Sequence, residues 1–203
     1  MEWAEVVRRR RMVRSFDGRP VAGVVLDRVL DAARRAPSAG FSQGVDLLVL
    51  VGVEQTERYW ELAFPDAAQR SRFRWPGLFA APVLVIPVVA PEAYLARYRE
   101  ADKEGSGARA DRAELAGWPV PYWWVDGGMV VMSALLAAVD QGLGALFFAL
   151  EHPDTVLPAL GVPPQRLALG TIALGHPEAL EEPGRSSTRP RRPLDDVVHR
   201  GHW

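Results

Sequence analysis

The sequence contains no cysteine, and this absence excludes several kinds of chemistry at once. Disulfides, thiolate metal sites, iron–sulfur clusters and cysteine nucleophiles are all ruled out. Lysine is nearly missing too, since Lys103 is the one lysine among 24 basic residues. Any redox chemistry must therefore come from a bound organic cofactor, and any basic site must be built from arginine.

Several binding motifs are also missing. No glycine-rich dinucleotide or P-loop fingerprint follows an expected strand, and no Gly-x-Ser-x-Gly elbow is present. A bound phosphate would therefore be held by side chains rather than by the amides of a helix N-terminus. The histidines do not cluster with carboxylates at metal-ligand spacing, so we expect no metal site. These histidines are His152, His176, His199 and His202.

The chain has no long apolar segment of the kind that spans a bilayer. Its longest apolar run, 127–139, is too short and ends at Asp140 and Gln141, and the N-terminus lacks the apolar core of a signal peptide. We therefore expect a cytoplasmic protein without membrane contact. The net charge of −1 also argues against a nucleic-acid binder, which usually needs a wide basic face.

The 203 residues, 48% hydrophobic and 24% charged, are enough for one substantial core, and we predict a single domain over 1–203. Apolar periodicity predicts helices over 2–10, 21–35, 54–62, 92–102, 125–142 and 153–160, and strands over 45–53, 79–90, 145–150 and 166–174. Residues 195–199 could form a terminal strand or arm. Helices and strands are mixed without a βαβ repeat.

Three of these elements carry more specific expectations. The β-branched run 45–53 is typical of a buried strand, whereas Pro87 suggests that strand 79–90 lies at an edge or ends early. The helix 125–142 is apolar nearly all round, so it should be central or lie at a subunit interface. Between them, residues 103–121 are predicted to form a mobile excursion or lid.

The most informative stretch is basic: five arginines fall within the seven positions 8–14. Such a run is often a solvated face. Here Arg10 and Arg14 are four residues apart and alternate with apolar neighbours, which indicates partial burial. Arginine is well shaped for bidentate phosphate contacts. A second cluster near the other end of the chain, Arg189, Arg191 and Arg192, would complete an anion pocket if the fold brings the two ends together.

Four motifs in the same order resemble those of the FMN-dependent nitroreductase family. The family pattern Arg-Arg-Ser-x-Arg-x-Phe is matched by residues 10–16, and Ala-Pro-Ser-x-x-Asn-x-Gln by residues 36–43. The family's Gly-Leu-Gly matches 142–144, and its terminal Arg-x-Arg-x-Pro-Leu fits 189–194. The chain departs from these patterns at Met12, where the family has serine, at Phe41, where it has asparagine, and at Gly44-Val45, which replace Pro-Trp.

The resemblance implies an α+β fold with a mixed, mainly antiparallel central sheet flanked by helices. It also implies an interlocked homodimer with two FMN molecules at the interface. Position by position, Arg10, Arg189 and Arg191 would hold the FMN phosphate. Arg14 would face the pyrimidine edge of the flavin, where its charge stabilises the anionic reduced form and makes it a catalytic residue.

The remaining cofactor contacts implied by the resemblance come from three segments. Pro37, Ser38 and Ala39 of the other subunit would line the ribityl chain and ring, and the segment Phe148, Ala149 and Leu150 would pass near flavin N5. The remaining motif positions Arg11, Met12, Phe41 and Gln43 belong to the same cofactor shell.

The function implied by the resemblance is an oxidoreductase with a ping-pong cycle. NADH or NADPH reduces the flavin and leaves, and a nitroaromatic, a quinone or another small electrophile then takes the electrons. The excursion, with Tyr122, Trp123 and Trp124 behind it, would select the acceptor, or these rings would only pack the core.

Other functions stay open at this stage. One alternative keeps the fold and performs dehalogenation, ring dehydrogenation or flavin cleavage. Another is a non-enzymatic binder of flavin or of another phosphorylated ligand. Nucleic-acid binding through the arginine run is the least favoured.

Overall fold

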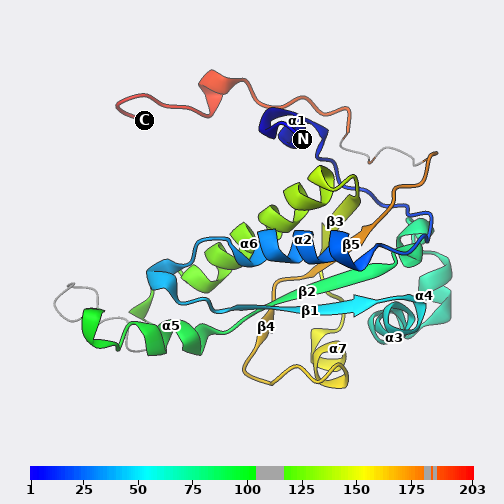
Figure 1. Ribbon diagram of the computed structural model, residues 1–203, viewed down its shortest axis with the longest axis horizontal. Helices are drawn as coiled ribbons and strands as arrows, with labels where there is room; N and C mark the ends of the chain where they lie inside the picture. Colours follow the sequence, from blue (N-terminus) through cyan, green and yellow to red (C-terminus); the bar gives the residue numbers. More distant parts are fainter. Residues whose placement is uncertain (104–116, 181–183, 185–186) are drawn as a thin grey trace.

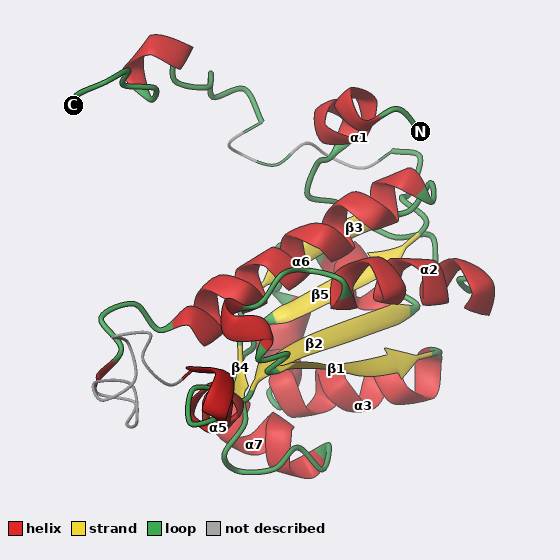
Figure 2. Ribbon diagram, turned by 60° about the vertical axis from the view of Figure 1, so that its left-hand side comes forward, coloured by secondary structure: helices red, strands yellow, loops and turns green. Residues whose placement is uncertain are grey.

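Five strands form one sheet at the centre of the structure, with helices on both faces (Figures 1 and 2). The computed structural model describes residues 1–103, 117–180, 184 and 187–203. The helices are α1 (Trp3–Arg9), α2 (Gly23–Arg34), α3 (Val53–Ala63), α4 (Ala67–Ser71), α5 (Pro91–Arg97), α6 (Tyr122–Asp140) and α7 (Pro153–Ala159). Short 3₁₀ turns are η1 (Ala39–Phe41), η2 (Pro76–Ala80), η3 (Ala101–Lys103) and η5 (Leu194–Asp196). The strands are β1 (Val45–Val51), β2 (Val83–Val89), β3 (Gly144–Phe148), β4 (Leu167–Ala168) and β5 (Thr171–Gly175).

The sheet has the order β1-β2-β5-β3, and β4 pairs with β2 beyond the end of β5. All pairs of these strands are antiparallel, and a parallel contact is made by the isolated bridge between Met12 and Ala145. The predicted α+β fold with a mainly antiparallel sheet flanked by helices is therefore confirmed.

Both faces of the sheet are buried. In β2, Leu84, Ile86 and Val88 pack with α3 and α7, whereas Val83 and Val85 pack with α2 and α6. This alternation follows from the two-residue period of a strand. Because each face meets a helical layer, β2 consists of apolar residues without the polar alternation of a half-exposed strand.

Two predictions about the strands were wrong in opposite senses. The expected buried strand is β1, which lies at the edge of the sheet and leaves Val51 45% exposed. The strand expected to lie at an edge or to end early because of Pro87 is β2, which is central and continues past Pro87 to Val89. The carbonyl oxygen of Pro87 accepts a hydrogen bond from the Leu169 N–H at 3.0 Å. The nitrogen of Pro87, which carries no hydrogen, faces the same neighbouring chain as this carbonyl. There the ladder is already interrupted between β4 and β5, so no ladder hydrogen bond is lost.

Other boundaries moved as well. The predicted strand 166–174 is divided into β4 and β5, because the backbone turns at Gly170, whose φ of 150° and close approach to the Phe148 carbonyl exclude a side chain. The predicted helix 92–102 ends at Arg97, and the predicted helix 125–142 begins earlier, at Tyr122. Residues 195–199 form no strand, and the described C-terminal residues 187–203 form an exposed arm that leaves the body of the protein (Figures 1 and 2).

Helix α6 is longer than the apolar run that the sequence suggested. With 19 residues and a mean hydropathy of 1.4, the helix is long and apolar enough to cross a membrane on length and composition alone. However, 44% of its apolar stretch is buried inside the protein. The buried side packs on α2 and the sheet, as in a core helix. Its outer side exposes Val125, Met129 and Met132. The helix is therefore central, which is one of its two predicted places, and its place at a subunit interface stays a prediction that this exposed apolar strip motivates.

The predicted excursion 103–121 falls mostly on residues 104–116, which lie outside the described residues. Of its described end, Trp118 is buried and packs against Tyr94 and Trp123. Trp123 therefore belongs to an aromatic core cluster. Of the two roles expected for the three rings behind the excursion, Trp123 has the role of packing the core.

Helix α2 allows a matched test of the packing. Val29 is fully buried between α6 and the sheet, whereas Val24 on the same helix is 60% exposed. We predict that Val29→Ala lowers the free energy of unfolding by about 1.5–3 kcal/mol, because it removes two methyl groups and leaves a cavity. Val24→Ala should change it by less than about 0.5 kcal/mol. Urea unfolding of both variants measures this, and equal losses would contradict the assigned inner face of α2.

Candidate active site

The arginine segment follows α1 and runs along the edge of β3. The Val13 N–H donates to the Ala145 carbonyl at 2.9 Å, and Met12 forms the parallel bridge to the same residue. Val13 and Phe16 are buried in the core, which fixes the backbone between them. Arg14, the one arginine between them, is therefore held at the sheet and does not belong to a loose basic tail.

The arginines of this segment have different environments. Arg8 is exposed, and Arg9 forms an i,i+4 ion pair with Glu5 at 2.7 Å, so these two fit the solvated-face interpretation. Arg11 is exposed and lines a cavity of about 190 Å³ beside Gly142. Arg10 differs, because its Nη1 is shielded from solvent and makes no hydrogen bond with any described residue. A shielded guanidinium nitrogen without a partner is costly unless an anion binds it.

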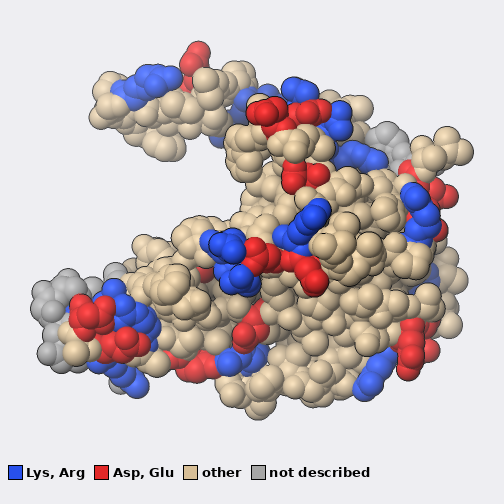
Figure 3. All heavy atoms as spheres, viewed as in Figure 1, with Lys and Arg blue, Asp and Glu red and all other residues tan. Residues whose placement is uncertain are grey.

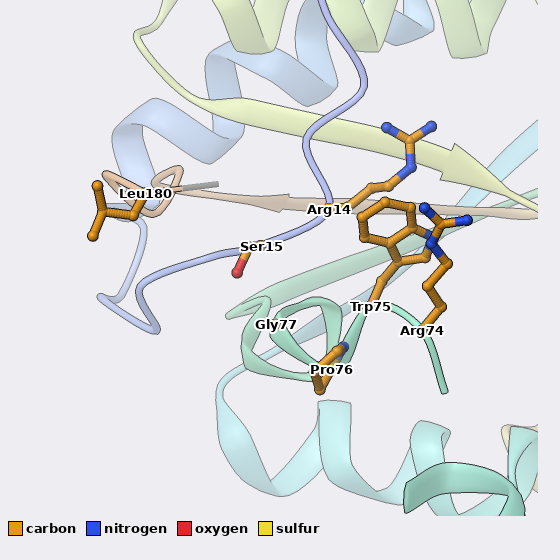
Figure 4. Close-up of a pocket in the computed structure, with 7 residues that line it drawn as sticks. All are labelled: Arg14, Ser15, Arg74, Trp75, Pro76, Gly77 and Leu180. Carbon is orange, nitrogen blue, oxygen red and sulfur yellow. The ribbon is translucent and has the colours of Figure 1, made fainter. Parts of the chain in front are cut away.

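Arg14 lies in a second cavity, of about 160 Å³ (Figure 4). Its Nη1 donates to the Met12 carbonyl at 2.9 Å, and its guanidinium carbon lies 5.3 Å from the centre of the Trp75 ring. Arg74 approaches the same ring at 4.6 Å, so two cations share one indole. Arg74 was missed in the sequence, because it lies in an irregular segment that matches no motif.

A strained loop carries the second group of candidate residues. Phe41 and Gln43 have φ values of 59° and 49°, in the left-handed region that side chains other than glycine rarely adopt. Each such residue costs on the order of 1–3 kcal/mol unless its surroundings impose the conformation. Asparagine tolerates this region well, which explains the asparagine that the motif has where this chain has Phe41. Pro37, Phe41 and Gln43 are exposed, whereas Ser38 and Ala39 are half-buried.

Two hydrogen bonds tie this loop to α6 and α5, and a third fixes the Asp126 side chain that makes one of them. The Ala39 N–H donates to Asp126 Oδ2 at 2.8 Å, and Arg97 Nε donates to the Gly40 carbonyl at 2.7 Å. The Tyr94 hydroxyl donates to the same Asp126 oxygen at 2.7 Å. Burial, together with this carboxylate, raises the pKa of Tyr94, so the phenol remains a donor at any physiological pH.

Asp126 was also missed in the sequence. Its signal was present, because it is the one charged residue within the largely apolar positions 123–139. Gly44, another departure from the motif, has a structural reason: a Cβ there would collide with the Tyr94 ring, so the loop can pass close to this tyrosine.

The remaining predicted residues are placed as follows. Phe148 stacks on Trp60 with ring centres 5.8 Å apart, Leu150 is half-buried and Ala149 is exposed at the end of β3. Arg189 and Arg191 are exposed on the C-terminal arm. Within one chain, the structure thus brings the arginine segment and β3 together and leaves the two arm arginines on an extension.

The arginine segment and the strained loop lie near opposite ends of α2 (Figure 1). Twelve helical residues span about 18 Å, so one chain does not place both groups around the same end of a small ligand. A cofactor that contacts both groups at close range would need the loop of a second copy.

A third cavity, of about 400 Å³, lies between the start of α6, α7 and the segment before β4. Trp124, which is 40% exposed, lines it together with Leu157 and Leu167. Of the rings behind the excursion, Trp123 therefore packs the core and Trp124 faces a cavity.

The loop strain leads to a prediction on stability. Replacing Phe41 by glycine should raise the free energy of unfolding by about 0.5–1 kcal/mol, because glycine adopts a φ of 59° without strain and the ring is 72% exposed. Phe41→Ala removes the ring but keeps the strained backbone, so it should give no gain. Thermal and urea unfolding measure both variants. A loss of stability in Phe41→Gly would mean that the ring makes a stabilising contact in the assembled protein.

Comparison with known proteins agrees with this geometry. A sequence model of the nitroreductase family matches residues 7–176. The FMN reductase (NAD(P)H) of Bacillus subtilis is 25% identical over 193 residues, which are 93% of this chain and 69% of that protein.

Solved structures share the fold. A nitroreductase family protein from Clostridium difficile 630 superposes with a TM-score of 0.72 at 19% identity over 100% of both chains. A putative nitroreductase from Desulfovibrio desulfuricans, solved in complex with FMN, gives 0.67 at 22% identity, over 98% of this chain and 95% of the other. With a family model that spans most of the sequence and a fold shared over its whole length, the chain belongs to the nitroreductase family.

Proposed function

We propose that the protein is an FMN-dependent oxidoreductase that takes electrons from NADH or NADPH and passes them to a small electrophile in a ping-pong cycle. The family membership supports this class of enzyme, as do the names of the Bacillus subtilis relative and of the FMN complex. A nitroaromatic or a quinone would be a suitable acceptor. The observation that carries the proposal is the solvent-shielded Arg10 Nη1, which makes no hydrogen bond within the described part of the chain.

The residues fit the phosphate of FMN. A monophosphate carries nearly two negative charges and needs several charged donors to replace its hydration. Arg10 offers a donor that is already desolvated. Its backbone position is fixed by the nearby bridge between Met12 and Ala145 of β3. Arg189 and Arg191 would supply further guanidinium groups, because they sit on an extended arm that is free to meet Arg10 within a dimer.

We propose a homodimer, because the site is incomplete in one chain. The loop 37–43 lies near the far end of α2 from Arg10 and Arg14, so a second chain would bring its own loop to these arginines. The apolar strip of α6, Val125, Met129 and Met132, would be covered in the same assembly. The exposed arm would reach across it.

The residues near the flavin would act by charge and by position. Bound FMN would supply the electron carrier between the nicotinamide and the acceptor. Arg14, held by the Met12 carbonyl and the Trp75 ring, would keep a fixed positive charge beside the pyrimidine edge, which favours the anionic reduced form. Arg74 would strengthen that field. Phe148, Ala149 and Leu150 would offer backbone and apolar groups at the other edge.

Trp124 is our proposed contact for the acceptor. It faces a cavity of about 400 Å³ lined mainly by apolar and proline side chains, which suits a flat small molecule. The excursion 103–121, predicted to act as a lid, would add to this selection.

We also propose that the protein is cytoplasmic and binds neither nucleic acid nor membranes. On the face of the molecule seen in Figure 3, basic and acidic side chains alternate, and they do not form a wide basic surface. Of the arginine run, Arg9 pairs with Glu5 and Arg14 lies on Trp75, so the run does not offer a continuous basic surface for a nucleic-acid backbone.

Anaerobic spectroscopy tests the function. The FMN-loaded protein should lose its flavin absorbance in the visible when NADH or NADPH is added, and recover it on addition of a quinone. Flavin that stays oxidised with both nicotinamides would reject the reductase and favour the dehydrogenating or flavin-cleaving chemistry. Protein that takes up no FMN at all would reject the flavoenzyme.

The phosphate assignment predicts a difference between neighbouring arginines. Arg10→Ala and Arg191→Ala should each weaken FMN binding by about 10- to 100-fold, since each removes a charged donor to the phosphate. Arg11→Ala is the matched control and should change it by less than about threefold, because the motif match counts Arg11 in the cofactor shell but does not assign the phosphate to it, and Arg11 lines the cavity beside Gly142. Titration of FMN fluorescence gives the three dissociation constants, and equal values would overturn the assignment.

A further inference from the structure

The buried carboxylate of Asp126 joins three elements that the sequence keeps apart. It is 2% exposed and lies in the first turns of α6. One of its oxygens accepts both the Ala39 N–H of the loop and the Tyr94 hydroxyl of α5. A carboxylate buried on an apolar helix is expensive, so its retention requires a compensating role.

The loop that Asp126 holds cannot keep its shape alone. Phe41 and Gln43 adopt left-handed backbone conformations, and such strain persists only where surrounding contacts impose it. Within the loop, the Gln43 N–H donates to Ser38 Oγ at 3.0 Å and the Phe41 N–H to the Ser38 carbonyl at 2.8 Å. These bonds shape the turn but do not tie it to the rest of the protein.

Two anchors make that tie. Asp126 fixes the loop at Ala39, and Arg97 fixes it at the Gly40 carbonyl. Arg97 is itself held by Asp102 through two hydrogen bonds of 2.6 Å, so this anchor is a surface network on α5. Asp126 is the anchor that comes from the core, and α6 is packed against the sheet.

We infer that Asp126 is a positioning residue for the flavin: through Ala39 and Tyr94 it holds the loop 38–43 in the strained shape that contacts the cofactor. This rests on the proposed function, in which the loop lines the flavin. A side chain that served only to join α6 to α5 would affect the stability of the fold without affecting FMN affinity.

The test compares Asp126→Ala and Asp126→Asn in the full-length protein freed of flavin. Alanine removes the acceptor and leaves two buried donors unpaired, whereas asparagine keeps an acceptor oxygen in the same place. Asp140→Asn, at the other end of α6, is the matched control. Tyr94→Phe, which removes one donor and keeps the ring, is measured as well in case Asp126→Ala does not fold.

The readouts are the FMN dissociation constant, hydrogen–deuterium exchange over 38–43 without flavin, and the melting temperature. Asp126→Ala should weaken FMN binding by at least about tenfold and speed exchange of the loop, and Tyr94→Phe should weaken binding by about threefold. Asp126→Asn and Asp140→Asn should stay within about twofold of the native protein.

Unchanged affinity and unchanged loop exchange in Asp126→Ala or Tyr94→Phe would overturn the inference, even if the melting temperature fell. A native protein that binds no FMN would instead defeat the proposed function. In that case the exchange measurement would still decide whether Asp126 holds the loop.

Discussion

The packing of α6 between α2 and the sheet is the interaction on which the rest of the structure depends. Its buried side closes one face of the central strands through side chains such as Val130 and Leu135. The same helix carries Asp126 to the loop after α2 and Trp124 to the cavity of about 400 Å³. The site is thus an extension of the core, and its polar groups are as firmly placed as the apolar contacts beneath them.

Two costly features stand out against this packing. Arg10 keeps a shielded nitrogen without a hydrogen-bond partner among the described residues, and the loop 38–43 keeps strained backbone angles. Neither helps the isolated chain to fold. Both are compensated if the phosphate of a bound flavin pairs with Arg10 and the rest of the flavin packs against the loop 38–43. Because they lie near opposite ends of α2, we propose that two chains share each site, so that both requirements are met together.

Much of the fold could be predicted from the sequence, because apolar periodicity reports directly on helices and buried strands. Sheet order could not, since it depends on which strands find partners. Pro87 is central because the break at Gly170 faces its missing N–H, and no local pattern shows that pairing. The run 45–53 is equally apolar at an edge, because helices α3 and α6 lie against its two faces.

The site was only partly predictable, for a related reason. Spacing identified the arginine run, but only the fold separates Arg9, paired with Glu5, from Arg10, whose Nη1 makes no hydrogen bond with any described residue. Asp126 takes its role from a contact with Ala39, which lies 87 positions away in the sequence. Arg74 takes its role from the ring of its neighbour Trp75, which Arg14 also approaches in the folded chain. The strain at Phe41 is invisible until its φ is known.

The claim that each flavin site needs two chains is tested most directly by sedimentation followed at a wavelength where only flavin absorbs, over a dilution series. The account predicts that flavin sediments with a species of twice the 22.4 kDa of one chain and is released as dilution separates the chains. Flavin that stays bound with undiminished affinity to a 22.4 kDa monomer would contradict it.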